Sequence, residues 1–467
     1  MKVYQNQELK YFIENECQIN PLWKERDFVS YARKYMHSGR HEVLAIGGLR
    51  GTGKTVGLLQ SVSDLDAIYI TAQKEESETG RDYIEILKKT EKKHIIIDEY
   101  SWIKDRKDLD FFLYTLVQNG KRIAITGTES ITLDFLNYGN LIHRVDMIHV
   151  NLFTYEEFCR LYDKEPTKES CKEYLMFGGV FKEYAITNYN SMKNYIKTAI
   201  IDNLVGYMNG ALNEEKATAL VYSVLYKAIC PSNLKAVPTL KQNRLTVENF
   251  LEEFGIHPQV SFSEWELKNV TDILRQIGVV IELKNYDERS EKKYQYYITN
   301  PSLTCQLILN AYKLPELTND ILGHVFEASV ICHLEYHRFS EHTLCFLDTI
   351  LENGANKELD AVILTEKQER VYLIECKYRE DDTLSRKATI LDDNLEDVFP
   401  DSIIDGRYVI YNGNPVVHEL GNKQVIFSPI NEVLNNYSFF ERNAEEIKTI
   451  TALEKQEGLP KRNIQKR

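Results

Sequence analysis

The sequence predicts an α/β protein of several domains, and three stretches support that prediction. The first is an apolar run at 43–47 that leads through a glycine-rich turn into a helical pattern. The second is His94–Glu99, where three isoleucines end in two acids. The third is a pair of apolar runs near the C-terminus, 358–364 and 371–377, that contain acids. Alternation of buried strands and helices is typical of parallel sheets covered by helices. We therefore expect a parallel sheet in the N-terminal part and a second α/β unit in the C-terminal part.

Length and composition limit the class of protein. A chain of 467 residues is too long for one core, so we expect about three domains. The net charge of −13 argues against a general polyanion binder, although a local basic groove can occur on an acidic protein. The eight cysteines are scattered and show no metal-ligand spacing, which favours reduced thiols. Because no long apolar run or signal-peptide pattern is present, we expect a cytoplasmic protein with no membrane partner.

The stretch Gly48–Thr55 fits the pattern G-x-x-x-x-G-K-[ST] of a phosphate-binding loop. Between a strand and a helix, such a loop points backbone N–H groups inward at the positive end of the helix dipole. Lys54 would reach the β- and γ-phosphates of ATP, and the Thr55 hydroxyl would bind Mg²⁺. The alternative is a chance glycine-rich turn, against which the flanking strand and helix argue. The residues expected to bind nucleotide here are Gly48, Gly51, Thr52, Gly53, Lys54 and Thr55.

The two acids at the end of the isoleucine strand predict a second part of the same site. Asp98 can hold Mg²⁺ through water, and Glu99 can polarise an attacking water as general base. Two solvated acids at the end of a strand are the alternative. The metal ligands expected at this site are therefore Thr55 and Asp98.

Two further positions could contact the γ-phosphate. Thr126, at the end of the strand that begins at residue 122, could sense it, and Thr128 is an equal candidate. Arg144 precedes a fifth strand and could contact the γ-phosphate of its own or a neighbouring subunit. The alternative is a surface arginine, and Arg50 is a weaker candidate for the same role. With this strand, we expect a five-stranded parallel sheet with helices on both faces.

A second set of chemical groups lies near the C-terminus. A helix at 320–336 carries Glu327, and the paired strands that follow carry Asp360, Glu375 and Lys377. Side chains alternate along a strand, so Glu375 and Lys377 share a face, and Asp360 on the neighbouring strand can converge with Glu375 on one Mg²⁺. Lys377 could orient a hydroxide or stabilise the charged transition state, and Glu327 could complete the site. A charged hairpin on a solvated face is the alternative.

Several stretches together resemble a family of prokaryotic AAA-type ATPases, in the branch of P-loop ATPases that uses a catalytic glutamate. These stretches are Gly48–Thr55, Ile95–Glu99, Ile125–Ser130, Asn151–Phe158 and Phe177–Phe181. The family has a PL(S/T)(F/Y)xEF segment and a GGFP-like turn. This chain departs from it at Asn151 and Phe153, near the expected Pro-Leu, and at Val180-Phe181, which replaces Phe-Pro. The resemblance implies a helical or winged-helix segment and a C-terminal domain similar to restriction nucleases. The Asp360…Glu375-x-Lys377 set matches the Asp…Glu-x-Lys arrangement of that nuclease fold.

The middle of the chain fits a winged helix. Helical patterns at 214–228, 246–251 and 263–278 precede two strand patterns at 279–283 and 294–298. Such folds often read DNA through the third helix. Here the third helix carries more acids than cations, which favours packing or protein contact over binding to duplex DNA.

The sequence thus predicts four segments with separate roles. They are an ATPase domain at 1–200, a helical or winged-helix domain at 201–312, a restriction-endonuclease-like domain at 313–440 and a tail at 441–467. The predicted function is ATP hydrolysis coupled to a nuclease-like domain that acts on DNA with Mg²⁺. The alternative is a regulatory NTPase switch whose nuclease-like domain is inactive and binds a protein or nucleic-acid partner. A homo-oligomer is also a candidate assembly.

Overall fold

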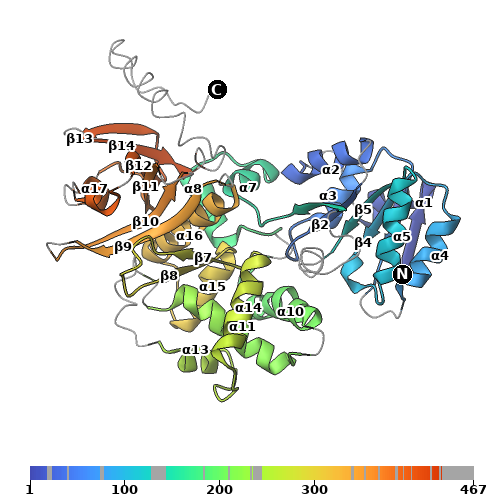
Figure 1. The fold of residues 1–467 in the computed structure, drawn as a ribbon, viewed down its shortest axis with the longest axis horizontal. Helices are drawn as coiled ribbons and strands as arrows, with labels where there is room; N and C mark the ends of the chain where they lie inside the picture. The colour runs from blue at the N-terminus through green and yellow to red at the C-terminus, as the bar shows by residue number, and fades with distance from the viewer. Residues whose placement is uncertain are drawn as a thin grey trace, which may run out of the picture.

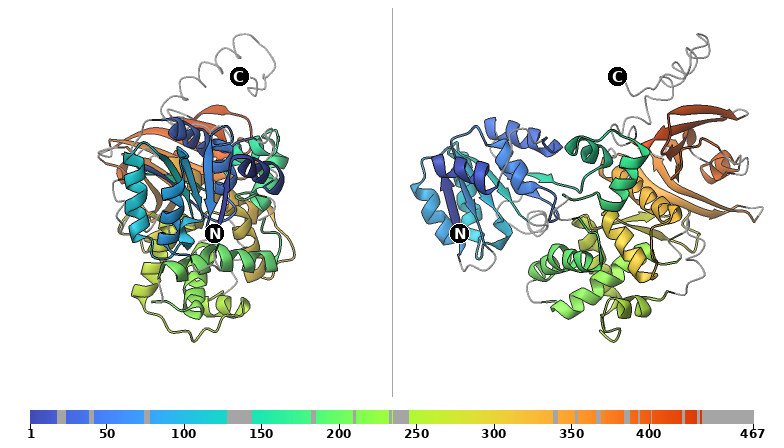
Figure 2. Two further views of the ribbon diagram at one scale, coloured as in Figure 1. Left: turned by 90° about the vertical axis from the view of Figure 1, so that its right-hand side faces the viewer. Right: turned by 180° about the vertical axis from the view of Figure 1, so that it is seen from behind.

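The computed structural model describes most of the chain. The described residues form two lobes. The described residues are 1–17, 24–38, 42–73, 78–127, 144–181, 185–208, 211–231, 234, 245–337, 341–351, 354–365, 369–383, 388–392, 394–400, 402–420, 423–430 and 433. We call residues 1–149 the N-terminal lobe and residues 150–433 the C-terminal lobe. The two lobes lie side by side along the longest axis (Figure 1), and the view from behind shows the same division (Figure 2).

The N-terminal lobe is built on a six-stranded sheet. In chain order its strands are β1 Lys2–Gln5, β2 Val43–Gly47, β3 Ala67–Thr71, β4 His94–Asp98, β5 Arg122–Thr126 and β6 Val145–His149. Their order across the sheet is β1-β3-β4-β5-β2-β6. The five parallel strands predicted from the sequence are confirmed. The sequence analysis missed β1, which adds an antiparallel strand at one edge.

Helices cover both faces of this sheet, as predicted. One face carries α1 Asn6–Tyr11, α2 Asp27–His37 and α3 Lys54–Ser61, and the other carries α4 Gly80–Lys89 and α5 Lys107–Gln118. Along β4, Ile96 packs toward α2 and α3, whereas Ile95 and Ile97 pack toward α4 and α5. All three isoleucines are fully buried because each face of the strand is covered by helices.

The first part of the C-terminal lobe is mainly helical. Its elements are α7 Tyr155–Leu161, α8 Lys168–Phe177, α9 Tyr189–Tyr195, η4 Ile196–Ile201, α10 Asp202–Tyr207, α11 Glu214–Ile229, α13 Val247–Glu253, α14 Glu264–Gln276, β7 Val280–Lys284, β8 Tyr294–Ile298 and α15 Pro301–Ala311. The order of α11, α13, α14 and an antiparallel β7–β8 hairpin is the order that the sequence predicts. Its assignment to a winged helix stays a prediction.

The last part of the C-terminal lobe contains a second sheet against a long helix. Its elements are α16 Asn319–His337, β9 Thr343–Ile350, β10 Asn356–Leu364, β11 Arg370–Lys377, η6 Thr389–Leu391, α17 Leu395–Val398, β12 Ile403–Tyr411, β13 Val416–Leu420 and β14 Lys423–Pro429. The strand order is β13-β14-β12-β11-β10-β9. Because β11 pairs antiparallel with β10 and parallel with β12, the sheet is mixed.

One of the two hydrophobic clusters of the C-terminal lobe extends across the predicted domain boundaries. Buried side chains of α8, α11, α15, α16 and β11 belong to a single cluster. The predicted boundaries at 200 and 312 therefore fall inside a continuous core, and α7, α8 and α9 pack with the elements that follow them. The predicted tail at 441–467 lies outside the described residues. Among the described helices, none is both long enough and apolar enough to cross a bilayer.

This shared core predicts cooperative loss of structure in the C-terminal lobe. Leu307 on α15 is fully buried in the cluster, so Leu307→Ala should lower the free energy of unfolding by about 2–5 kcal/mol. Hydrogen–deuterium exchange should then increase together in α8, α15 and β11. Ile96→Ala, at an equally buried position in the N-terminal sheet, is the matched control and should leave those three elements protected. Increased exchange confined to α15 would show that the core is divided.

Candidate functional site

The phosphate-binding loop joins β2 to α3, and glycines occupy the positions where its backbone demands them. Gly51 and Gly53 both have φ of 82°, a left-handed conformation that glycine adopts without steric cost. A Cβ on Gly48 would lie 2.5 Å from the carbonyl oxygen of Val150, so the close passage of the chain excludes a larger residue. The loop therefore has the shape that allows backbone to approach a phosphate group.

Lys54 and Thr55 begin α3, directly after the loop. The Lys54 Nζ donates hydrogen bonds to the carbonyl oxygens of Gly48 and Leu49, at 2.7 and 2.9 Å. These bonds curl the ammonium group back over the loop. The Thr55 hydroxyl donates to the Asp98 carboxylate, with 3.0 Å between Oγ1 and Oδ2. The hydroxyl and the acid predicted to share Mg²⁺ are thus in direct contact.

Asp98, at the end of β4, is only 3% exposed and is satisfied by hydroxyl groups. Besides Thr55, the Tyr69 hydroxyl donates to Oδ2 at 2.6 Å, and the Thr126 hydroxyl donates to Oδ1. Thr126 is therefore buried beside Asp98. Its proposed role in sensing the γ-phosphate stays a prediction. Thr128 lies outside the described residues. Sequence reasoning missed Tyr69, because its hydroxyl reaches Asp98 only once β3 pairs with β4, a register that places Tyr69 opposite Ile96.

Glu99 follows Asp98 with a strained backbone and an unsatisfied side chain. Its φ of 55° is unusual for a residue other than glycine and is typical of functional sites. The Glu99 Oε2 atom is buried and has no hydrogen-bond partner. Burial, followed by the charge of Asp98, raises the pKa of Glu99 to about 7, although Lys54 and Arg50 act in the opposite direction. A carboxyl with a pKa near neutrality suits a general base.

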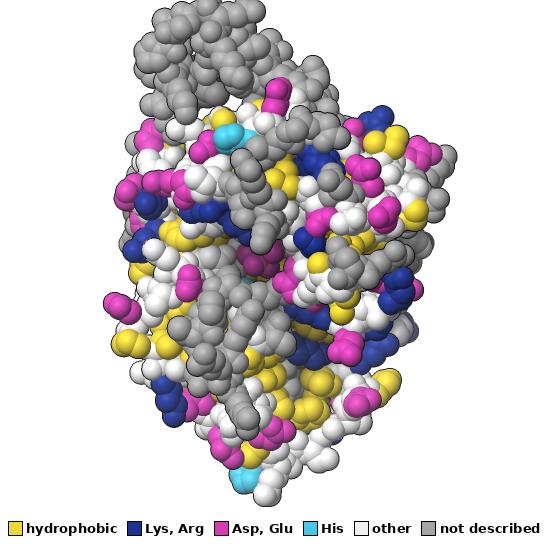
Figure 3. Space-filling model, turned by 90° about the vertical axis from the view of Figure 1, so that its left-hand side faces the viewer, with side chains coloured by type: hydrophobic (Ala, Val, Ile, Leu, Met, Phe, Trp, Pro, Cys, Tyr) yellow, Lys and Arg dark blue, Asp and Glu magenta, His cyan; other side chains and the backbone are white. Residues whose placement is uncertain are grey.

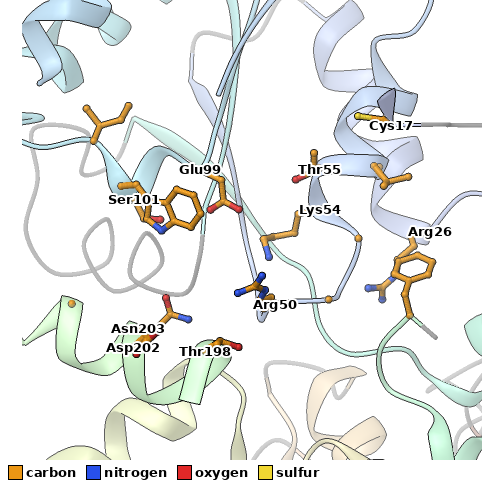
Figure 4. Close-up of a pocket in the computed structure, with 18 of the residues that line it drawn as sticks. Cys17, Arg26, Arg50, Lys54, Thr55, Glu99, Ser101, Thr198, Asp202 and Asn203 are labelled. Carbon is orange, nitrogen blue, oxygen red and sulfur yellow. The ribbon is translucent and has the colours of Figure 1, made fainter. Parts of the chain in front are cut away.

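These residues line a cavity of about 1550 Å³ between the two lobes. Arg50, Lys54, Thr55 and Glu99 lie on the N-terminal side, and Thr198, Asp202 and Asn203 from η4 and α10 lie across from them (Figure 4). The volume exceeds that of usual small-molecule pockets, so a nucleotide fits within it. Sequence reasoning missed the opposite wall, because no motif marks those positions. The glycine cradle, the ammonium group and the orphaned Glu99 oxygen together fit ATP with Mg²⁺.

The structure does not bring Arg144 to the phosphate loop of its own chain, which corrects that part of the prediction. Its carbonyl oxygen accepts a hydrogen bond from the Val43 amide at the start of β2, whereas the loop follows the end of that strand. The Arg144 guanidinium instead lies over the ring of Tyr114, 4.1 Å from its centre. The weaker sequence candidate, Arg50, lines the cavity.

The C-terminal acids form a second cluster, and the hairpin of the middle segment holds one of them. The Glu327 carboxylate, on α16, is 9% exposed. Its Oε1 accepts hydrogen bonds from the Tyr297 hydroxyl at 2.7 Å and from the Gln295 amide at 3.3 Å. Both donors lie on β8. Sequence reasoning missed them, because nothing local connects β8 to α16.

Asp360, Glu375 and Lys377 come together on β10 and β11, as predicted. Asp360 accepts a hydrogen bond from the Cys376 amide at 2.7 Å, and Lys377 Nζ lies 3.6 Å from Glu375 Oε1. The Glu375 Oε2 atom is buried without a hydrogen-bond partner, and burial raises the pKa of Glu375. Burial alone would lower the pKa of Lys377, but Asp360 and Glu375 raise it. Within the described ranges, no group of three or more His, Cys, Asp or Glu is already arranged to hold a metal ion.

Comparison with known proteins identifies the class of the N-terminal lobe. Residues 40–159 match the sequence family described as an AAA domain. With the loop and acid pair, this match supports an AAA-type P-loop ATPase domain, a class that binds and hydrolyses ATP with Mg²⁺. The match does not extend over most of the C-terminal lobe. No curated protein matches the chain.

Similarity to solved structures is distant. Hsp104 of S. cerevisiae in its casein complex shares 11% identity, with a TM-score of 0.27. That comparison covers 58% of this chain and 52% of the Hsp104 chain, so this chain spans about half the length of that protein. The Holliday junction branch migration motor RuvB of Thermotoga maritima shares 12% identity, covers 57% and 89% of the two chains and has a TM-score of 0.24. The Drosophila ORC structure bound to DNA shares 10% identity, covers 66% and 91%, and has a TM-score of 0.26.

The raised pKa of Glu99 predicts a pH-dependent stability difference in nucleotide-free protein. The usual pKa of 4.5 rises to about 7 in the folded state, so folding favours the protonated acid and stability falls as pH rises between these values. Glu99→Gln should therefore be more stable than wild type by about 3 kcal/mol at pH 8, and this gain should largely vanish at pH 4.5. Urea unfolding at both pH values measures the difference. Glu169→Gln, which changes an exposed acid on α8, is the control. An equal gain at both pH values would contradict the assignment.

Proposed function

We propose that the chain is an ATP-binding and ATP-hydrolysing protein whose C-terminal lobe carries a Mg²⁺-dependent nuclease-like site. The observation that most supports hydrolysis is the buried, unsatisfied carboxylate of Glu99 beside Lys54 in the inter-lobe cavity. Glu99 accepts a proton from the attacking water, and Lys54 leaves the loop carbonyls to bind phosphate oxygens. Thr55 and Asp98 would hold Mg²⁺, which would neutralise charge on the phosphates when bound.

Two substitutions separate nucleotide binding from hydrolysis. Lys54→Ala should abolish measurable ATP binding, because it removes the cation of the loop. Glu99→Gln should keep ATP binding while lowering kcat by about 10²–10⁴-fold, because the amide cannot accept the proton. Fluorescent-nucleotide titration and phosphate release measure the two effects. Arg81→Ala, which removes an exposed cation on α4, should leave both near wild type. Full turnover in Glu99→Gln would remove the general base from the proposal.

The nuclease-like assignment of the C-terminal lobe is supported by the chemistry of its acidic cluster. Asp360, Glu375 and Lys377 lie together on neighbouring strands, and Glu327 approaches from the helix that packs on β11. Charged groups are rarely buried unless they are paired, and the orphaned Glu375 Oε2 offers an oxygen ligand. Asp360 and Glu375 would hold Mg²⁺, which when bound activates water and stabilises charge on a phosphodiester. Lys377 orients the hydroxide.

DNA cleavage tests this assignment directly. Asp360→Ala and Glu375→Ala should each abolish Mg²⁺-dependent cleavage of plasmid DNA, because each removes an oxygen ligand. ATP turnover should stay intact in both variants. Glu369→Ala, an exposed acid beside the start of β11, is the matched control and should cleave like wild type. Cleavage that persists in the Asp360 and Glu375 variants would come from another source and would exclude the nuclease site.

A regulatory switch that binds a partner through its C-terminal lobe is the second candidate. The cation Arg275, on α14, pairs with Asp272 at 3.3 Å and with Glu282 at 3.1 Å, so it is drawn away from a phosphate backbone. Acidic and basic side chains are interspersed on the face shown in Figure 3. DNA approaching that face would meet both signs of charge. ATP turnover without cleavage would favour a protein partner, or a second copy of the chain. The predicted cytoplasmic location also stays a proposal.

A further inference from the structure

The phosphate-binding loop is held by more than its own sheet. Leu49, within the loop, is 4% exposed and belongs to the hydrophobic cluster of the C-terminal lobe. The next residues of the loop also receive contacts from outside β2 and α3. Two of the sequence motifs noted above, Asn151–Phe158 and Phe177–Phe181, supply most of them. Neither motif has a part in the chemistry proposed for the site.

Arg26, just before α2, reaches the loop from the N-terminal side. Its Nη1 donates to the carbonyl oxygen of Thr52 at 2.8 Å and to that of Asn151 at 2.9 Å. Its Nε and Nη2 donate to the two carboxylate oxygens of Glu157 at 3.0 and 2.5 Å. Both side chains are at least 93% buried. A planar guanidinium satisfies this fork of acceptors, whereas a lysine ammonium cannot.

Phe181 covers the loop from the side of the C-terminal lobe. Its amide donates to the carbonyl oxygen of Gly51 at 3.2 Å, and a Cβ on Gly53 would lie 2.4 Å from its ring. The ring meets that of Phe153 edge to face at 4.7 Å, and the Arg26 guanidinium lies 4.6 Å above the Phe153 ring. Gly51, Thr52 and Gly53 are therefore contacted by a connected group of side chains from other elements, and two members of the group, Arg26 and Phe181, also line the cavity.

This group continues into the helices of the C-terminal lobe. The Tyr174 hydroxyl, on α8, donates to the carbonyl oxygen of Phe153 at 2.8 Å, and the Phe153 amide donates to that of Gly179 at 2.9 Å. A Cβ on Gly179 would lie 3.1 Å from Pro301, the first residue of α15. The geometry of the loop is thus tied to α8 and α15 through direct contacts.

We propose that Arg26, Glu157 and Phe181 are positioning residues that dock the phosphate-binding loop on the C-terminal lobe and thereby set nucleotide affinity. This inference rests on the proposed binding of ATP at that loop. A loop whose carbonyl oxygens are already hydrogen-bonded to the protein keeps its shape before nucleotide arrives, so less ordering accompanies binding. The segments Asn151–Phe158 and Phe177–Phe181 then affect nucleotide affinity through the shape of the loop, without contacting the reacting atoms.

Conservative substitutions and a nearby control test this docking. Arg26→Lys, Glu157→Gln and Phe181→Leu should each raise the Kd of Mg²⁺ with a fluorescent ADP analogue by about tenfold or more, because charge-assisted or close contacts to the loop are lost. The KM for ATP should rise with the Kd, while kcat at saturating ATP stays within about threefold of wild type. Lys168→Ala is the matched control. Lys168 is an exposed cation at the start of α8 and pairs with Glu380 at 3.3 Å, not with a residue of the loop, so the Kd should not change.

The outcomes separate the inference from the function on which it rests. A purely structural role would lower the melting temperature of the variants and leave the Kd unchanged, which would overturn the inference. If the wild-type protein itself binds no nucleotide, the proposed ATP site is wrong. The inference about nucleotide affinity then fails with it. If Arg26→Lys fails to fold, the Phe181→Leu variant and hydrogen exchange of the wild-type protein still test the docking proposal. Added nucleotide should slow exchange at the Phe181 amide together with the loop amides, and an unaffected Phe181 amide would count against docking.

Discussion

The buried carboxylate of Asp98 is the constraint around which the nucleotide end of the sheet is arranged. A carboxyl group that is almost out of water is costly to bury unless hydrogen-bond donors surround it. Here Thr55, Tyr69 and Thr126 supply hydroxyl groups from three different elements. Those bonds fix the start of α3 against β3 and against the ends of β4 and β5. The phosphate loop directly precedes α3, so these bonds help to place the end of the loop.

The adjacent acid, Glu99, has the opposite environment. This difference separates the roles expected of the two acids. Asp98 has three hydroxyl donors, whereas one Glu99 oxygen is buried without any. Neighbouring carboxyl groups whose surroundings differ in this way divide into a structural or metal-binding acid and a proton acceptor. The left-handed backbone at Glu99 turns its side chain away from the sheet and into the cavity. Local backbone strain and an unmade hydrogen bond thus occur together at the position where reactivity is expected.

Features encoded by short-range pattern could be predicted from the sequence, and features that depend on distant contacts could not. The five parallel strands, the loop at Gly48–Thr55 and the gathering of Asp360 with Glu375 follow from local periodicity and pairing. Strand β1 was missed, because its short polar sequence becomes a strand only beside β3. The predicted contact of Arg144 with the phosphates of its own chain was wrong, because Arg144 precedes β6 and the start of a parallel strand lies at the edge of the sheet opposite the loop. The hydrogen bonds from Arg26 to Glu157 join residues 131 positions apart, so no local sequence pattern predicts them.

The hydrogen bonds from β8 to Glu327 have a consequence for how such a chain can change over generations. The acid and its two donors, Tyr297 and Gln295, are encoded in separate stretches on either side of residue 312. Recombination that replaced only the later stretch would import a buried carboxylate and leave its donors behind. For that reason we expect recombination to exchange the C-terminal lobe as one unit. We also expect substitutions in the β7–β8 hairpin to be accompanied by substitutions in α16.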